Sequence, residues 1–353
     1  NPSSPHAEGR AARAMLEDAR TRIARLVEAK PDDVVFTSGA TEANALAILG
    51  VVRANHGGHV LYDPGAHASI VENVRMLARE GAVIETLSLR DGRVDIEALR
   101  KLLRPETVLV AMEAVNGETG AIWNTREVRQ ALDAARPMGA PRILLHVDAS
   151  QAVHTEKLTR AHFGADLMTL DASKVLEARG IGCLIAHRTI PLAPLYGGGG
   201  QERGLRPGSE SPELAHAFAD ALARASAGAE GFRAEAAKMR ARLLAELRDI
   251  LGLLVNEGAK QAPHILNVSL PGRDTDYLVA LLDEAGFAVS TKSACESDSE
   301  EGSRAVLALT GDQERAKSSL RISWGPGHSR SDLHRFGTAL RESVAFIDSA
   351  GRA

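Results

Sequence analysis

Short apolar runs that alternate with amphipathic helical patterns dominate the first part of this chain. The runs are Val34–Thr37, Val60–Tyr62, Val83–Leu87, Val108–Met112, Ile143–Asp148 and Leu167–Leu170. Between most of them lie stretches with helical spacing of apolar residues, such as Ser69–Arg79, Ile96–Leu103 and Arg126–Ala135. Apolar strands that alternate with helices favour an α/β fold, in which a mainly parallel sheet is covered by helices on both faces.

A change of pattern divides the chain in two. Loops rich in glycine and proline at 197–200 and 207–212 precede a long helical segment from about Glu213 to Leu251. Beyond it, shorter strands and helices indicate a smaller α+β unit. The length of 353 residues suits two domains at roughly 100–200 residues each. We therefore predict a large domain over residues 10–225, and a small C-terminal domain over 226–353 that also includes residues 1–9.

Composition excludes several classes of protein. A net charge of −4 gives no basic surface for nucleic acid or membrane, so we expect neither as a partner. No apolar run approaches the ~20 residues of a membrane span. The two cysteines, Cys183 and Cys295, suggest no disulfide framework, which favours the cytoplasm. We predict no metal site. The chain opens on Asn1 without Met, and we expect residues of the natural N-terminus to be missing.

Three polar segments follow apolar strands, where α/β folds place their ligands. Thr37–Glu42 reads TSGATE, and small residues before a helix N-terminus suit an anion. Asp148 ends a strand, and Lys174 follows another. Each has an ordinary structural explanation: a helix capped by Ser38, a capping aspartate and an exposed loop lysine. Together they supply a phosphate cradle, a carboxylate for a pyridinium nitrogen and an amine for an aldehyde, as pyridoxal phosphate (PLP) chemistry needs.

The whole chain also resembles the NifS/IscS-type cysteine desulfurases, PLP enzymes of fold type I in the class-V aminotransferase family. The matching segments run in family order: NPSSPHAEGR, VVFTSGATEANALAI, the His67 segment, VNGETG, HVDASQAV, the Lys174–GIG segment, GGGQERGLRPGS, SACESDSEEGSRAVLAL and LRISWG. The resemblance implies a large domain with a mainly parallel seven-stranded sheet sandwiched by helices, and a smaller α+β C-terminal domain. It also implies an obligate homodimer.

The resemblance assigns the cofactor-binding residues. Lys174 forms the Schiff base and later moves the Cα proton. Asp148 pairs with the pyridinium nitrogen, His67 stacks on the ring with a possible role in proton transfer, and Gln151 bonds the ring 3-oxygen. The phosphate ligands implied are Thr41, the backbone of Ala40, Ser173, and Ser209 toward the other subunit's phosphate.

The resemblance also assigns substrate and sulfur chemistry. Arg321 matches the arginine that clamps the substrate carboxylate, and Asn116 lies in a substrate-facing segment. Cys295 lies in a polar segment that predicts an exposed loop, as a travelling nucleophile requires, whereas Cys183 lies in an apolar strand that predicts a core residue. L-Cysteine would become L-alanine while its sulfur passes to Cys295 as a persulfide. An acceptor such as an Fe–S scaffold or a tRNA-thiolation protein would then receive it, as in the long-loop group.

The sequence departs from the family pattern mainly around the cofactor. Asp171 stands in place of a phosphate-binding hydroxyl, and Ser173 replaces a histidine. A carboxylate facing a phosphate must turn away, gain a cationic neighbour or weaken cofactor binding. We therefore expect weaker PLP binding or a rearranged phosphate site. The other departures are Gly117, Ala66, Glu177, Ala178 and Lys292.

Two further questions stay open in the sequence. The acidic residues around Cys295 either recruit a basic acceptor or form an ordinary solvated loop; they are Glu296, Asp298, Glu300 and Glu301. The same scaffold also suits a selenocysteine lyase, a class-V aminotransferase that does not need Cys295, or a homologue that has lost catalysis.

Overall fold

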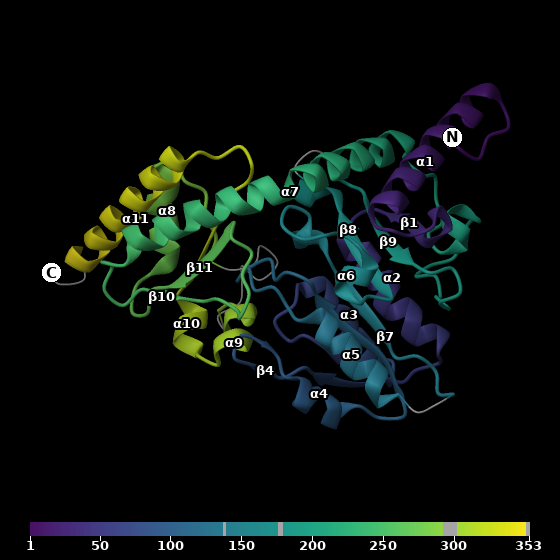
Figure 1. The fold of residues 1–353 in the computed structure, drawn as a ribbon, viewed down its shortest axis with the longest axis horizontal. Helices are drawn as coiled ribbons and strands as arrows, with labels where there is room; N and C mark the ends of the chain where they lie inside the picture. Colours follow the sequence, from purple (N-terminus) through teal and green to yellow (C-terminus); the bar gives the residue numbers. More distant parts are fainter. Residues whose placement is uncertain (137–138, 176–178, 292–301, 351–353) are drawn as a thin grey trace. The chain divides into compact units, whose positions relative to one another are not determined.

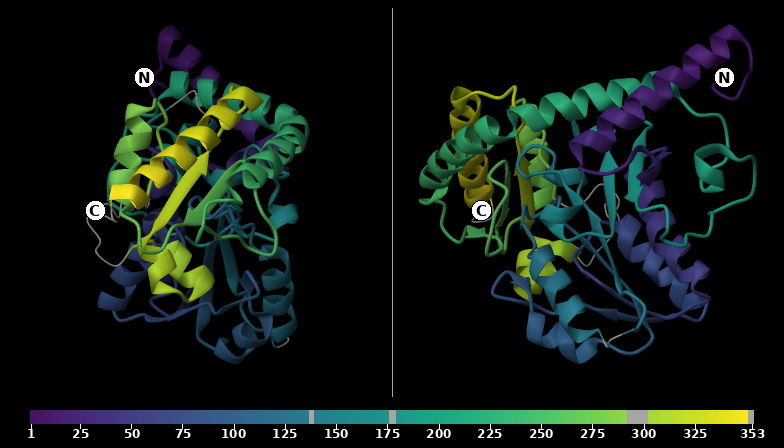
Figure 2. Two further views of the ribbon diagram at one scale, coloured as in Figure 1. Left: turned by 90° about the vertical axis from the view of Figure 1, so that its left-hand side faces the viewer. Right: turned by 45° about the vertical axis from the view of Figure 1, so that its right-hand side comes forward.

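The computed structural model describes residues 1–136, 139–175, 179–291 and 302–350, which form two compact units. The first unit consists of Asn1–Ser88, Val94–Val115 and Asn124–Ala229, and the second of Leu89–Arg93, Asn116–Trp123 and Glu230–Ala353. The expected boundary near residue 225 therefore shifts to 229, inside the long helix α7 (Pro212–Leu247), an unbroken helix in Figure 2.

Two other parts of the predicted domain division need correction. Residues 1–9 belong to the first unit, because they lead directly into α1 (Ala7–Leu26), which packs against β1 of that unit. The short segments 89–93 and 116–123 belong to the second unit, because their backbones bond to the loop at 259–262. These hydrogen bonds run from Ala259 N to Gly92 O, from Ile122 N to Lys260 O and from Ala262 N to Gly120 O.

The first unit is built on a seven-stranded sheet with the order β1-β9-β8-β7-β6-β2-β3. Its strands are β1 (Val34–Thr37), β2 (His59–Tyr62), β3 (Val83–Thr86), β6 (Thr107–Glu113), β7 (Leu144–Asp148), β8 (Leu167–Asp171) and β9 (Gly182–Ala186). Only β9 runs antiparallel to its neighbours. The predicted mainly parallel sheet is confirmed. The strands β1, β2 and β9 are buried along their whole length, and β6, β7 and β8 are buried at all but one residue, as a sheet covered on both faces requires.

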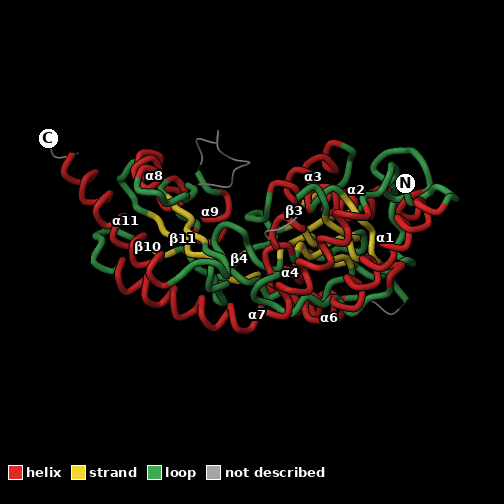
Figure 3. Tube along the Cα trace, turned by 90° about the horizontal axis from the view of Figure 1, so that it is seen from above, coloured by secondary structure: helices red, strands yellow, loops and turns green. Residues whose placement is uncertain are grey.

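Helices cover both faces of this sheet. The helices of the first unit, besides α1 and the first part of α7, are α2 (Ala40–Ala54), α3 (Ala68–Arg79), α4 (Ile96–Leu102), α5 (Thr125–Ala135) and α6 (Arg160–Phe163). Figure 3 shows α2 and α3 on one face and α6 on the opposite face. Apolar residues of α2 and α3 form one core with β2, β6 and β9. None of the helices in the described ranges combines the length and apolar character that a bilayer crossing requires.

The second unit is a small α+β structure. Its three-stranded antiparallel sheet has the order β10-β11-β12, and the short β4 and β5 pair separately. The elements are β4 (Leu89–Arg90), β5 (Arg93–Val94), β10 (Leu254–Val255), β11 (Ile265–Ser269), β12 (Ser319–Ser323), α8 (Thr275–Glu284), α9 (Arg304–Thr310), α10 (Gln313–Lys317) and α11 (Arg330–Ala350). Apolar residues of β11, β12, α8, α11 and the second half of α7 form its core.

The topology of the large sheet gathers polar residues at one edge. Because β1, β8, β7 and β6 point the same way, their carboxyl ends meet at the same edge, with β7 and β8 side by side (Figure 1). The last residues of these strands are Thr37, Asp171, Asp148 and Glu113. This edge is where open α/β sheets bind ligands.

Candidate active site

Asp148 presents a buried carboxylate at the end of β7. Its side chain is 6% exposed, and each oxygen accepts one hydrogen bond: Oδ1 from the backbone N–H of Ser150 at 2.9 Å and Oδ2 from Asn44 Nδ2 at 2.7 Å. Among the described residues, no lysine, arginine or histidine forms an ion pair with it. A carboxylate buried without a cation is costly, so such a group marks a site that takes a cationic or proton-donating ligand.

A chain of hydrogen bonds connects Asp148 to His67. The fully buried Asn44 amide donates to Asp148 and also to Ser69 Oγ, at 2.9 Å. Ser69 Oγ in turn lies 2.8 Å from His67 Nδ1. Asn44 thus uses its two amide protons to hold Asp148 directly and His67 through Ser69.

His67 itself is exposed and caps α3. Its Nδ1 accepts the backbone N–H of Ser69 at 3.2 Å, and its own backbone N–H donates to Glu113 Oε1 at 3.1 Å. With Nδ1 accepting, a neutral ring carries its proton on Nε2. His67 therefore has the structural role of a helix cap, and the same hydrogen bond fixes the orientation of its ring.

Lys174 lies directly after β8, in the short helix η3 (Ala172–Val175). It is exposed, and its ammonium group has no hydrogen-bond or ion-pair partner within the described ranges. Its carbonyl oxygen lies 3.0 Å from His154 Nε2. Burial lowers the pKa of His154, which favours the neutral ring that donates to this carbonyl. The backbone at Lys174 is thus tied to the loop after β7, while its amine is free to react.

Asp171 does not turn away from the predicted phosphate cradle. Its Oδ2 accepts the backbone N–H of Ala40, the first residue of α2, at 2.8 Å, and its Oδ1 accepts the N–H of Ser173 at 2.7 Å. The N-cap of α2 is Gly39, with no side-chain capping bond, so the alternative of a Ser38 cap is wrong. The Ser38 backbone N–H donates instead to Glu42 Oε2.

The other predicted cofactor residues lie in the first unit. Gln151 is half-buried in η2 (Ser150–Ala152), close after Asp148, and Ser173 is half-buried in η3. Thr41 is exposed in the first turn of α2, and Ser209 is exposed in the loop before α7. Cys183 is fully buried in β9, and burial raises the pKa of its thiol, so the predicted core role is confirmed.

The two predicted substrate residues lie in the second unit. Arg321 on β12 is half-buried and donates to Gly117 O at 3.3 Å and to Ser290 Oγ at 3.2 Å. No carboxylate among the described residues pairs with it. Asn116 is buried, and its Oδ1 accepts the backbone N–H groups of Glu118 and Thr119, which holds a turn together. Cys295 lies outside the described residues, as do Lys292 and the four acidic residues that follow.

Comparison with known proteins identifies the family. The Aminotransferase class-V family model matches residues 1–336. Cysteine desulfurase IscS 1 of Archaeoglobus fulgidus is 32% identical over 342 residues, which cover 95% of this chain and 87% of that protein. Cysteine desulfurase IscS of Methylococcus capsulatus is 33% identical, with 98% and 85% covered. A solved NifS-like protein superposes with a TM-score of 0.90 at 26% identity, covering 98% of this chain and 92% of its own.

The chain belongs to the IscS/NifS-type cysteine desulfurases of the class-V aminotransferase family. The predicted family and its fold, that of fold-type I PLP enzymes, are confirmed. The cysteine desulfurases depend on PLP, so the structure can be tested for its fit to that group.

The fit is good at two of the three ends of the cofactor. Asp148 offers a buried carboxylate with spare lone pairs to a pyridinium nitrogen, and Lys174 offers an unpaired amine to an aldehyde. At the phosphate end, the Asp171 carboxylate already accepts the first N–H of α2. The residues therefore suit PLP at its ring and its aldehyde, and differ from expectation at its phosphate.

Four residues that build this site were not predicted from sequence: Asn44, Ser69, Glu113 and His154. Asn44 stands inside the GATEAN segment, where a polar residue within an otherwise apolar helical stretch was the available signal. Its partner Asp148 lies 104 positions away, so their pairing depends on the fold.

Proposed function

We propose that this protein is a PLP-dependent cysteine desulfurase that converts L-cysteine to L-alanine and takes up the sulfur on Cys295. The observation that carries the proposal is the buried Asp148 carboxylate, held by Asn44 without a cation, one strand away from the unpaired amine of Lys174. Membership of the cysteine desulfurase family supports the choice of reaction.

When bound, PLP supplies an electron sink that makes the Cα proton of an amino acid acidic and weakens its Cβ–S bond. Asp148 keeps a proton at the ring nitrogen, and Asn44 fixes the orientation of that carboxylate. Lys174 Nζ would hold the aldehyde carbon and would move the Cα proton. His67 would pack against the ring and offer its Nε2–H for proton transfer, and Gln151 would bond the ring 3-oxygen.

The sulfur step uses residues from the second unit. Arg321 binds the substrate carboxylate through its guanidinium, since no carboxylate of the described chain occupies it. The Cys295 thiolate attacks the substrate sulfur, so the new S–S bond forms as the Cβ–S bond breaks. The electron pair of the broken bond stays on carbon, and two protons complete L-alanine. Asn116 positions the turn that holds Gly117 against Arg321.

We further propose a cytoplasmic homodimer in which Ser209 of each subunit reaches the other subunit's cofactor phosphate. The exposure of Ser209 before α7 supports such a contact. The persulfide then passes to an acceptor protein, such as an Fe–S scaffold or a tRNA-thiolation protein. Membership of the cysteine desulfurase family supports transfer of the sulfur to an acceptor.

The test is sulfide release from L-cysteine in the presence of a thiol reductant, with L-alanine measured in the same sample. We expect the wild type to form both products in equal amounts and Cys295→Ser to lose the activity. Cys183→Ala, which removes the buried thiol of β9, serves as the matched control and is expected to retain it.

Two outcomes would redirect the assignment. A Cys295→Ser variant that keeps full turnover of amino acids would indicate an aminotransferase instead. A kcat/KM for L-selenocysteine far above that for L-cysteine, with loss of activity in Cys295→Ser confined to L-cysteine, would indicate a selenocysteine lyase.

A further inference from the structure

The start of α2 is already occupied by an internal anion. Asp171 Oδ2 lies 2.8 Å from the backbone nitrogen of Ala40, and Oδ1 lies 2.7 Å from that of Ser173. The first N–H groups of a helix lack partners within the helix and carry a partial positive charge, so they stabilise an anion. In this chain the first of these groups, the N–H of Ala40, already donates to a side chain of the protein itself.

The backbone around Asp171 holds the carboxylate at this position. Asp171 on β8 and Thr37 on β1 both pair with Gly182 on β9, so the three lie in one row at the edge of the sheet. A Cβ atom at Gly182 would come within 2.8 Å of the Gly39 backbone, which shows how closely the turn before α2 packs on this row. A Cβ atom at Gly39 would lie 3.4 Å from Asp171 Oδ2.

The charge of Asp171 is not neutralised by an ion pair. No lysine, arginine or histidine of the described chain forms one with it, and its two recorded bonds come from backbone N–H groups. A phosphate dianion at the start of α2 would therefore meet a like charge at close range, or would have to displace the carboxylate from both N–H groups. Either event removes most of the binding energy that a phosphate normally gains at such a site.

We propose that Asp171 takes the place of the cofactor's phosphate, so that the protein binds unphosphorylated pyridoxal about as tightly as PLP. This inference rests on the proposed function, because it concerns the same site. Lys174 and Asp148 would contact only the parts that the two aldehydes share: the carbonyl carbon and the ring nitrogen. Asp171 is thus a specificity-determining residue for the class of B6 aldehyde.

The covalent step is the same for both aldehydes. Lys174 Nζ attacks the aldehyde carbon, a C=N bond replaces the C=O bond, and water leaves with the oxygen and two protons from nitrogen. No oxidant or reductant takes part. Borohydride, added as the reductant in the test, converts this bond to a stable secondary amine that marks the lysine.

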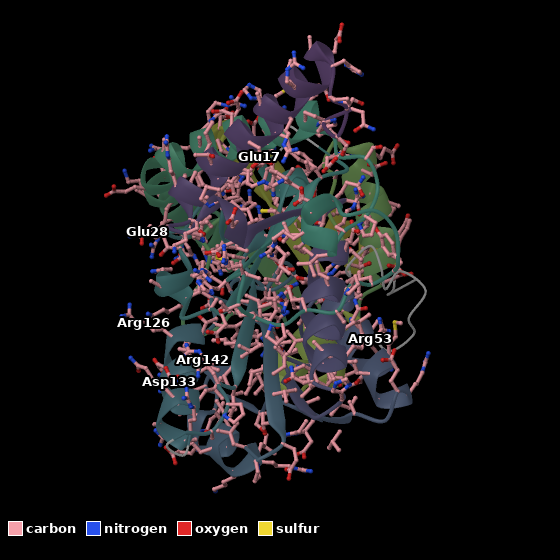
Figure 4. All side chains as sticks on the ribbon, turned by 90° about the vertical axis from the view of Figure 1, so that its right-hand side faces the viewer. Glu17, Glu28, Arg53, Arg126, Asp133 and Arg142 are labelled. Atoms are coloured by element: carbon pink, nitrogen blue, oxygen red, sulfur yellow. The ribbon has the colours of Figure 1, made fainter. Side chains whose placement is uncertain are left out.

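The experiment titrates the cofactor-free full chain with PLP and with pyridoxal, following absorbance, with each dissociation constant referred to the free aldehyde form. Asp171→Ser removes the carboxylate, and Asp171→Asn keeps its shape without its charge, which covers the case in which the serine variant folds poorly. Asp133→Ser is the control. Asp133 lies beside Arg142 on the outside of the same unit (Figure 4) and accepts a hydrogen bond from it at 3.3 Å.

We expect the two dissociation constants of the wild type to agree within about threefold, since the phosphate adds little to the binding free energy. In Asp171→Ser, and to a smaller extent in Asp171→Asn, PLP binding should tighten about tenfold or more, because a like charge is removed from the helix N-terminus. Pyridoxal binding should stay within about twofold, and Asp133→Ser should match the wild type in both titrations.

A wild type that prefers PLP by about a hundredfold or more, with the preference unchanged in both Asp171 variants, would overturn the inference and leave the proposed function standing. Mass spectrometry of the borohydride-treated protein distinguishes this result from a failure of the proposed function. If neither aldehyde labels Lys174, the proposed function itself is wrong.

Discussion

The two ends of the candidate cofactor site are built in opposite ways. At the ring end, Asp148, Asn44, Ser69 and His67 form a continuous hydrogen-bonded chain around a carboxylate that has no cation. At the phosphate end, the Asp171 carboxylate already has the first N–H group of α2 as its partner. The carboxylate at the ring end has no cationic partner among the described residues, whereas the helix N–H at the phosphate end already has a carboxylate partner from the same chain.

The difference shows which chemistry this chain keeps. The pyridinium partner and the lysine amine determine whether an aldehyde cofactor can react at all, whereas the phosphate ligands contribute mainly affinity. Under the proposed function, a chain that keeps the first pair and replaces a phosphate ligand by a carboxylate would retain the reaction and bind the cofactor phosphate less tightly. Substitutions should therefore have large effects at the ring end and at Lys174, and small effects among the remaining phosphate ligands.

The largest effect is expected at Lys174. Lys174→Ala removes both the amine that binds the aldehyde and the group that moves the Cα proton, so kcat for alanine formation should fall by at least about a thousandfold. Lys157→Ala, which removes an exposed lysine paired with Glu28 in the same unit, should keep full activity. Activity in Lys174→Ala within tenfold of the wild type, by the same assay, would show that another base does this work.

The next effect concerns the pH dependence of stability, through the buried His146 near the ring end. His146 lies two residues before Asp148, and burial lowers its pKa to about 4. Between pH 6.5 and 4 the unfolded chain takes up a proton that the folded chain refuses, so the free energy of unfolding should fall with decreasing pH by up to about 3 kcal/mol. Below pH 4 this contribution is fully lost and the curve should flatten.

Urea unfolding at a series of pH values measures this contribution. His146→Gln cannot take up the proton in either state and should lose this part of the slope. His334→Gln, which removes an exposed imidazole of α11, should keep it. Parallel curves for the wild type and His146→Gln would mean that the buried ring does not control the acid sensitivity.

A smaller loss of activity is expected when the hydrogen bonds that Asn44 makes at the ring end are removed. Asn44→Ala removes one hydrogen bond from the Asp148 carboxylate and one from Ser69, and a hydrogen bond to a charged group contributes about 1.5–3 kcal/mol. If half of this is expressed in the transition state, kcat should fall by about four- to twelvefold. Asn55→Ala, at the exposed C-terminal end of α2, is the control, and an unchanged kcat in Asn44→Ala would show that Asp148 needs no such support.

The smallest effect is expected at Thr41, a predicted phosphate ligand. Because Asp171 holds the start of α2, Thr41→Ala should weaken PLP binding by no more than about twofold in the wild-type background. In the Asp171→Ser background, where the phosphate can reach the helix, the same change should weaken it by about fivefold or more. A double-mutant cycle of PLP dissociation constants measures the coupling, and equal effects in both backgrounds would erase the contrast between the two ends.

Sequence predicted the elements of this fold well, because strands buried on both faces are continuous apolar runs. Val34–Thr37 is a strand with the predicted bounds, and the other five runs match strands to within one or two residues. The ring-end network could not be predicted, since Asn44 and Asp148 meet only when α2 packs on β7. At Asp171 three outcomes were open from the sequence, and the packing of the turn before α2 against the end of β8 excludes the one in which the carboxylate turns away.

The domain boundaries also depend on contacts between distant parts of the chain, which the sequence pattern does not predict. Residues 89–93 and 116–123 have no local signal that separates them from the large domain, and they join the second unit only through backbone bonds to the distant loop at 259–262. Such pairings over more than a hundred positions depend on where the chain folds back, which composition and periodicity do not encode.

The central claim, that the ring end and Lys174 support sulfur transfer, can be tested in a single turnover. The protein loaded with PLP is mixed with less than one equivalent of L-cysteine, without a reductant, and the products are analysed by mass spectrometry. We expect L-alanine and an equal amount of protein carrying one additional sulfur atom on Cys295. A keto acid with an unmodified Cys295, or recovery of unchanged L-cysteine, would contradict the account.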